Sequence, residues 1–376
     1  MMLRRLFRQN KNLLLFWFNL LVICQHTRGE SLRAIAVAGN GEKGFSISKI
    51  GINTMLNSPS GITLSPEGVI YICDTQNHVI QQATPTGVRP VAGTGKKGYS
   101  GDGGAATNAT LNEPTEVRLD AEGNIFVVER MNHVVRKIHQ KTGIISTIAG
   151  TGKAGFEGDG GLATGGLLNE PQSIQFDSNQ DLFICDTGNN RIRKVEKKTG
   201  LLTTFLGNGK KVNESKEVSW TNLALNGPAF MDLDKLGNIW LVLSQANVIW
   251  KIRPSQKTVE HIAGTGKSGN SGDGGPAEEA TLGNPSGISA ALDGNIYFAD
   301  TQNHRIRFID TREYLMQSFA GTGEKGDGPY GLATDCKFNS PRGIFVDTDG
   351  AVYVGDTGNH RVRVIMKMAT FPTPKK

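Results

Sequence analysis

Short apolar runs separated by polar turns repeat along almost the whole chain. In one copy PQSIQF begins at Pro171, LFICDT and RIRKV follow, and LLTTFLG ends the copy. The runs are rich in Ile, Val, Leu and Phe and are bounded by Gly, Asn, Asp or Pro. This pattern is typical of β-strands joined by tight turns, and no window holds a long helical stripe. We therefore predict four short strands in each copy.

The copies recur at a nearly constant spacing. A proline opens each copy, the steps between these prolines are 55 to 57 residues, and Gly-x-Gly pairs repeat in phase ahead of them. The opening residues are Pro59, Pro114, Pro171, Pro228, Pro285 and Pro341. A regular repeat of antiparallel four-stranded units is the pattern of a β-propeller. The predicted fold is therefore all-β, a six-bladed β-propeller.

The two ends of the repeated region complement each other. The sixth copy reaches its third strand at residues 361–365 and then continues without a fourth. SLRAIAVAG at residues 31–39 matches a fourth strand but has no blade of its own. We predict that this N-terminal strand completes blade six and closes the ring. The propeller is expected to span residues 30–368, with a short tail at 369–376.

The first 29 residues have a different pattern. Four basic side chains precede the apolar run LLLFWFNLLVIC at 13–24, and small residues follow at Thr27 and Gly29. This is the form of a secretory signal peptide, which predicts a secreted protein. The alternative is an uncleaved signal anchor at the membrane. A helix of that run is only about 18 Å long, against about 30 Å of hydrocarbon, so no stable membrane span is expected.

Charge and sequons narrow the class of partner. Residues 1–29 hold five of the 41 basic side chains and no acid, which leaves 36 basic and 35 acidic residues. A near-neutral chain without Lys/Arg runs is not expected to bind nucleic acid. Asn108 and Asn213 begin N-x-S/T sequons and are candidate glycosylation sites.

One polar turn recurs between the second and third strands. It reads DTQNH, ERMNH, DTGNN, DTQNH and DTGNH, whereas blade four has LSQAN. Asp and Asn side chains hydrogen-bond backbone groups in turns, and Asn tolerates left-handed backbone. The four histidines could instead bind a metal, but blades fan outward, so equivalent residues cannot all meet one ion at about 2 Å. We assign a structural role, and no metal, to Asp74, Asn77, His78, Asn132, His133, Asp186, Asn189, Asp300, Asn303, His304, Asp356, Asn359 and His360.

With P-x-G-I at the blade openings and IAGTG between blades, this turn resembles the NHL-repeat family of six-bladed propellers over residues 31–365. The loops between blades carry one acid each in a GDGG sequence or its shorter counterpart, at Asp102, Asp159, Asp273 and Asp327. Such loops could bind phosphate or calcium, but no helix follows them and one carboxylate is too few for calcium. We expect them to pack over the blade edges.

The resemblance also raises a catalytic alternative. Amidating-lyase relatives place zinc-binding histidines directly after the opening proline, and lactonase-type propellers gather acids around calcium at the axis. Here the residues after the prolines are Ser60, Thr115, Gln172, Ala229, Ser286 and Arg342. Glu116 is the one acid at the next position. We therefore predict no cofactor and a non-catalytic scaffold for a protein or glycan. The alternative is a hydrolase or lyase with a divalent metal in the central tunnel.

Blade four departs from the repeat. It lacks the polar turn and the GDGG loop, and it contains Trp220, Trp240 and Trp250. Neutral drift is one explanation, and a recognition surface is the other, since aromatic side chains anchor interfaces. The chain is expected to act as a monomer. The candidate binding residues are Trp220 and Lys216 in blade four, with Glu116 and Arg342 at the ring axis.

Overall fold

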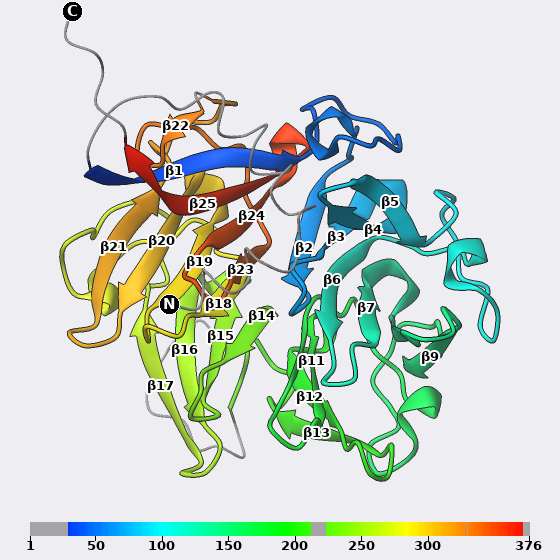
Figure 1. Cartoon of the computed structure of the whole chain (residues 1–376). Helices are drawn as coiled ribbons and strands as arrows, with labels where there is room; N and C mark the ends of the chain where they lie inside the picture. Colours follow the sequence, from blue (N-terminus) through cyan, green and yellow to red (C-terminus); the bar gives the residue numbers. More distant parts are fainter. Residues whose placement is uncertain (1–28, 212–222, 329, 371–376) are drawn as a thin grey trace, which may run out of the picture.

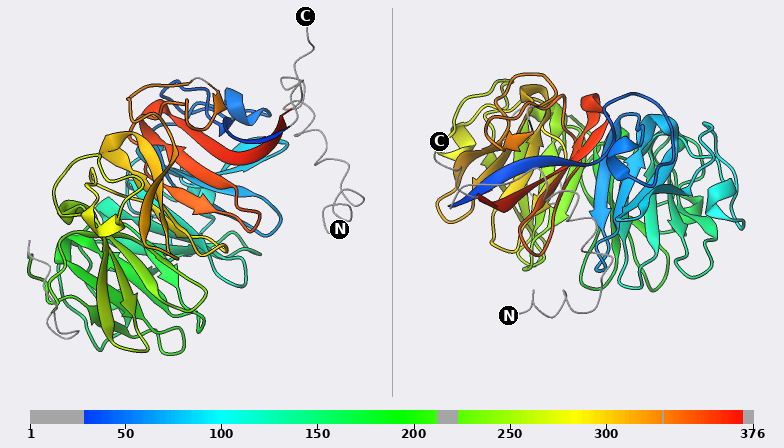
Figure 2. Two further views of the ribbon diagram at one scale, coloured as in Figure 1. Left: turned by 90° about the vertical axis from the view of Figure 1, so that its left-hand side faces the viewer. Right: turned by 45° about the horizontal axis from the view of Figure 1, so that its top comes forward.

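A ring of six antiparallel sheets forms the molecule (Figures 1 and 2). The computed structural model describes residues 29–211, 223–328 and 330–370. Five sheets have four strands and the sixth has five. Each innermost strand contacts the innermost strand of the next blade, and the last contacts the first. The predicted all-β, six-bladed propeller is confirmed.

The first three blades follow chain order from the axis outward. Blade one contains β2 (Pro59–Leu64), β3 (Ile70–Asp74), β4 (Val79–Thr84) and β5 (Gly87–Ala92). Blade two contains β6 (Pro114–Leu119), β7 (Ile125–Glu129), β8 (Val134–Ile138) and β9 (Ile145–Ala149). Blade three contains β10 (Ile174–Phe176), β11 (Leu182–Asp186), β12 (Arg191–Val195) and β13 (Leu202–Leu206).

Blades four and five repeat this order, and blade six joins the two ends of the chain. Blade four contains β14 (Pro228–Leu233), β15 (Ile239–Leu243), β16 (Val248–Arg253) and β17 (Thr258–Ala263). Blade five contains β18 (Ile288–Ala290), β19 (Ile296–Asp300), β20 (Arg305–Asp310) and β21 (Leu315–Ala320). Blade six contains, from the axis outward, β23 (Ile344–Val346), β24 (Val352–Asp356), β25 (Arg361–Thr370), β1 (Gly29–Ala38) and β22 (Gly331–Leu332).

The described helical elements are single 3₁₀ turns. Six lie in the turns between second and third strands: η2 (Thr75–Asn77), η4 (Arg130–Asn132), η6 (Thr187–Asn189), η8 (Ser244–Ala246), η10 (Thr301–Asn303) and η11 (Thr357–Asn359). Others lie between blades: η1 (Gly51–Asn53), η3 (Ala106–Asn108), η5 (Ala163–Gly165) and η9 (Ala277–Glu279). Within the described ranges, no helix has the length and apolar character that crossing a membrane requires. The predicted signal peptide lies almost wholly outside those ranges, in residues 1–28.

The N-terminal strand closes the ring as predicted. Strand β1 pairs antiparallel with β25 from Gly29 opposite Thr370 to Ala38 opposite Val362, and Figure 1 shows the two strands side by side. Strand β25 continues past Ile365, where the sequence pattern placed its end, because β1 supplies partners for the additional backbone groups. The short strand β22 then pairs with the outer edge of β1.

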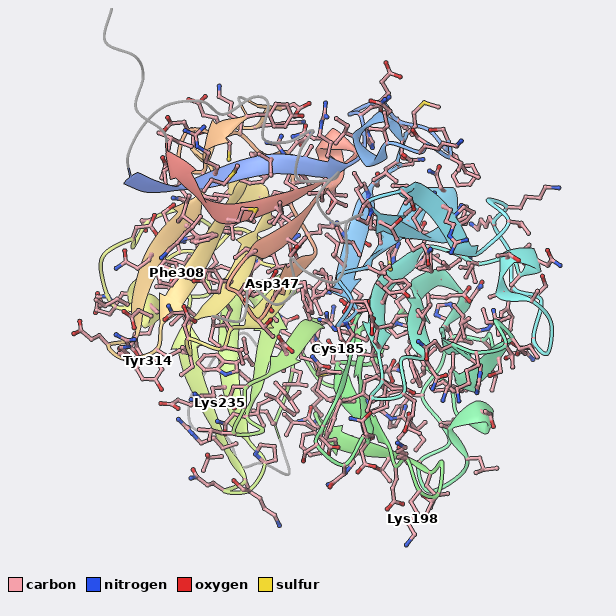
Figure 3. All side chains as sticks on the ribbon, viewed as in Figure 1. Cys185, Lys198, Lys235, Phe308, Tyr314 and Asp347 are labelled. Atoms are coloured by element: carbon pink, nitrogen blue, oxygen red, sulfur yellow. The ribbon has the colours of Figure 1, made fainter. Side chains whose placement is uncertain are left out.

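Apolar side chains pack between neighbouring blades. Phe230 and Trp240 of blade four, for example, belong to one buried cluster with Ile288 and Phe298 of blade five. Each blade therefore buries its face against the next one, and the buried clusters among the described residues all join two blades. Figure 3 shows Cys185, a buried free thiol, near the middle of the ring.

Candidate functional site

In every blade but the fourth, the recurring polar turn ties the blade to the loop that precedes it. In blade three, the Asp186 carboxylate accepts hydrogen bonds from the Asn169 backbone N–H at 2.7 Å and from the Asn189 side chain at 2.8 Å. Asn189 also donates to the carbonyl of Gly155, at 2.7 Å. The side chains of Asp74, Asn77, Glu129, Asn132, Asp300, Asn303, Asp356 and Asn359 make the equivalent contacts.

The last residue of the turn joins one blade to the next. His133 has left-handed backbone with φ of 55°, and its Nδ1 accepts a hydrogen bond from the Glu170 N–H at 3.0 Å. Glu170 immediately precedes the opening proline of blade three. The same interblade bond is made by His78, His304 and His360, and by the side-chain oxygens of Asn190 and Asn247. Across the described residues, no three metal-ligating side chains come together.

A buried arginine on the third strand of a blade forms an ion pair with the acid of the preceding interblade loop. Arg193 is fully buried and contacts Asp186 at 3.2 Å and the loop residue Asp159 at 2.8 Å. Phe156 of the same loop lies over the guanidinium group. The triads of the other blades are Arg136 with Glu129 and Asp102, Arg307 with Asp300 and Asp273, and Arg363 with Asp356 and Asp327.

These ion pairs explain why the loop acids recur. Asp102, Asp159, Asp273 and Asp327 hold the loops against the blades through the buried arginines, which fits the expected packing role. The arginines escaped the sequence analysis, although they stand seven residues after each turn acid. Their co-occurrence with the loop acids in the same four blades was the available signal.

Blade four replaces this network by apolar packing. Leu243 and Trp250 occupy the positions of the turn acid and the arginine, and both belong to a buried apolar cluster. Trp240 is also buried, and its indole N–H donates to Asp234 at 3.1 Å. Two of the three blade-four tryptophans are therefore core residues. Trp220, Lys216 and Asn213 lie outside the described ranges.

At the ring axis, Glu116 is buried and its carboxylate contacts Arg118 at 3.4 Å. Burial raises the pKa of Glu116 to about 7, against the opposing effect of Arg118, and the nearby Asp232 adds to the rise. Asp232 accepts hydrogen bonds from Gln175 of blade three and from the Ala290 N–H of blade five. The sequence analysis missed Arg118 and Asp232, because it considered only the two positions after each opening proline.

Arg342 lies at the same axis but in a different environment. Its side chain is exposed and has no hydrogen-bond or ion-pair partner within the described part of the chain. The surrounding protein still removes part of its hydration, and the nearby Arg130 adds positive charge, so the pKa of Arg342 lies below its usual value. Arg130 is itself paired with Glu113 and Glu170. Of the predicted axis residues, Arg342 is thus accessible and Glu116 is not.

Family models match three segments of the chain. The NHL repeat model matches residues 56–82 and 338–365, and the Teneurin NHL domain model matches residues 245–327. These segments contain the polar turns of blades one, five and six. This chain is a propeller built of NHL repeats.

One similar protein is NHL repeat-containing protein 2 of Homo sapiens. It is 26% identical over 292 residues, which cover 70% of this chain and 40% of the human protein. The chain spans less than half of the length of the curated relatives that it matches.

Solved structures share the fold at low sequence identity. An auxiliary nutrient binding protein from Bacteroides thetaiotaomicron superposes with a TM-score of 0.68 and 14% identity, covering 90% of this chain and 77% of its own. Virginiamycin B lyase from Staphylococcus aureus gives a TM-score of 0.54 and 13% identity, covering 90% and 99%. A binding protein and a lyase thus share the architecture, and the fold alone does not decide between these functions.

We expect this NHL propeller to become less sensitive to acid when its four turn histidines are replaced by asparagine. Burial lowers the pKa of His78, His133, His304 and His360. Each neutral histidine therefore favours folding above its unfolded pKa of about 6.5, and this contribution is lost as the pH falls through the lower folded pKa. Asn190 and Asn247 make the same bond without titrating.

The measurement is the melting temperature of both proteins between about pH 7.5 and about pH 5. The fourfold variant should lose less stability on acidification than the parent. The buried carboxylates are common to both proteins and cancel in the comparison. Parallel curves for the two proteins would show that these histidines do not contribute to the acid response.

Proposed function

We propose that this NHL propeller is a secreted, non-catalytic interaction module that binds a protein or glycan on its surface. The observation that carries the proposal is that the polar residues recurring in each repeat make structural contacts. The turn acids, the loop acids, the arginines and the histidines are engaged in contacts within and between blades. The residues typical of catalytic sites thus hold the scaffold together, and the blades differ mainly in their surface loops. Loops on a rigid scaffold are the usual place for binding.

The axis supports a binding role over a metal-dependent reaction. A divalent metal in a propeller axis needs several converging oxygen or nitrogen ligands. Glu116 is instead buried beside Arg118, and the residues directly after the opening prolines include no histidine. Arg342 offers an unpaired cation that could contact a ligand at the axis.

Secretion and glycosylation belong to the same proposal. The sequence pattern of residues 1–29 supports export, and Asn108 lies exposed at the end of η3, where a glycan would meet no obstacle from the blade. We also propose that the protein acts as a monomer.

The test measures binding of extracellular domains by the chain, purified from the medium of cells that secrete it. The purified chain should bind, saturably, a small subset of a panel of purified extracellular domains, and it should hydrolyse no lactone. A matched variant exchanges the blade-four loop 207–227 for the blade-three loop 150–170, which has the same length. Loss of binding in this variant would assign the contact to blade four. Lactone hydrolysis that disappears in Glu116→Gln, or binding to none of the domains, would overturn the proposal.

A further inference from the structure

Blade one lacks the buried ion pair but, unlike blade four, does not replace it by apolar packing. Gln81 occupies the arginine position, is fully buried and lies close to the Asp74 carboxylate, but neither end of its amide makes a hydrogen bond of ordinary geometry. The preceding loop reads FSISKIGI, with no acid where blade two has YSGDGG. Both members of the interblade contact are thus absent together.

This loop exposes four large apolar side chains within eight residues. Phe45 is 42% exposed, Ile47 64%, Ile50 57% and Ile52 47%. Tyr99, the counterpart of Phe45 in blade two, lies over the buried Arg136, but Phe45 has no arginine to cover. Exposed apolar residues that are concentrated on one loop indicate an interaction surface.

A cavity of about 620 Å³ adjoins the loop. It is lined by Ile47, Ser48 and Lys49 of the loop, by Glu67, and by the β4–β5 hairpin from Gln82 to Arg89. The Val88 N–H donates to the Ser48 carbonyl at 2.8 Å, so loop and hairpin form one wall. The cavity can take an apolar side chain that a flat surface could not hold.

The lining of the cavity has more positive than negative side chains. Lys49 and Arg89 line it against one acid, Glu67. Outside the lining, Lys43 at the start of the loop stands beside the exposed Glu42. Lys43 and Lys49 are exposed. A partner that inserts an apolar side chain would therefore gain from carrying carboxylates beside it.

We propose that the loop 43–55 and the adjoining cavity form a docking surface for a protein segment that presents a large apolar residue next to aspartate or glutamate. The inference rests on the proposed binding function and names the surface and the chemistry of the partner. The cavity favours a protein segment over a lipid surface, because a bilayer offers no single side chain to fill it.

The experiment uses a random peptide library displayed on phage and selected on the immobilised full chain. Selected sequences should combine a large apolar residue with neighbouring acids. The affinity of a selected peptide should fall by about tenfold or more in Ile47→Asp/Ile50→Asp. It should stay unchanged in the control Leu236→Asp/Leu292→Asp, which alters two exposed leucines on blades four and five.

A second variant keeps the fold by using the repeat itself. It exchanges residues 44–55 for residues 98–110 of blade two and adds Gln81→Arg, which restores the acid and the arginine together. Lys43 bridges Leu56 as Lys97 bridges Leu111, so the two loops begin and end at equivalent points. This variant should melt at or above the parent temperature and lose the peptide.

The inference would be overturned if Ile47→Asp/Ile50→Asp and the variant with residues 44–55 exchanged both bind the peptide as tightly as the parent. Two other results would also overturn it if no peptide is selected. One is binding of the parent to phosphatidylserine vesicles that is lost in these two variants. The other is self-association of the parent in the ultracentrifuge that is lost in them. If extracellular domains bind the parent and the variant with residues 44–55 exchanged equally, the proposed docking surface is wrong and the proposed function stands. If they bind neither, the proposed function itself fails.

Discussion

Replacing Arg307 by methionine should lower the free energy of unfolding by about 3–5 kcal/mol. Arg307 is fully buried and contacts the carboxylates of Asp300 and Asp273, at 3.2 and 2.6 Å, and the carbonyls of Thr281 and Ser271. Its removal leaves the buried Asp300 charge uncompensated and takes away one of the two arginines that pair with Asp273 of the loop. Chemical denaturation of parent and variant measures the loss.

Two comparisons test the physical reason. Lys197→Met breaks a largely exposed ion pair with Glu122 and should cost less than about 1 kcal/mol. Asp300→Leu/Arg307→Trp copies the Leu243 and Trp250 pair of blade four, and it should be more stable than Arg307→Met because no buried charge remains. Equal stability of Arg307→Met and the parent would show that this network does not hold the blade.

Deleting β1 should cost most of the stability of the ring. Strand β1 pairs with β25 over its whole length, and Ala34 and Ala38 are fully buried. A chain that starts after residue 38 would expose one long edge of β25 and separate the two ends of the ring. The expected loss exceeds about 5 kcal/mol, which is comparable with the total stability of many domains.

The control is deletion of residues 371–376, which lie beyond the last strand and should leave the melting temperature unchanged. Because the shortened chain could fail to fold, a peptide of residues 29–38 should be added to it. Restored melting behaviour would show that this strand closes the ring without a covalent connection to β2. Equal melting temperatures for the two deletions would contradict the closure.

The repeat pattern accounts for how much of the fold could be predicted. Four apolar runs per copy and a proline at a nearly constant spacing define the strands. A surplus strand before the first copy and a missing fourth strand in the last copy define the closure. These are local signals, because alternation and turn residues act within a few positions. The end of β25 was placed too early, since its last residues owe their pairing to β1.

The candidate sites were less accessible to the same reasoning. Glu116 was predicted as a candidate binding residue, and its burial and its contact with Arg118 depend on how neighbouring blades meet at the axis. Trp240 and Trp250 are core residues, a result of packing between blades that composition does not show. The exposed loop of blade one was overlooked, since its apolar residues could equally have been buried.

The sequence by itself determined the number of blades, the order of the strands and the position of the polar turns, because hydrophobic alternation and turn chemistry are written in neighbouring residues. Only the tertiary structure decided which polar groups meet. Arg193 forms an ion pair with Asp159, which lies 34 residues earlier in the sequence. His133 accepts a hydrogen bond from the Glu170 backbone N–H at the start of the next blade. Such contacts follow from the distance between blades in the closed ring, which no local pattern records. The same geometry leaves Phe45 and its neighbours exposed on blade one, where the arginine that this loop would cover is absent.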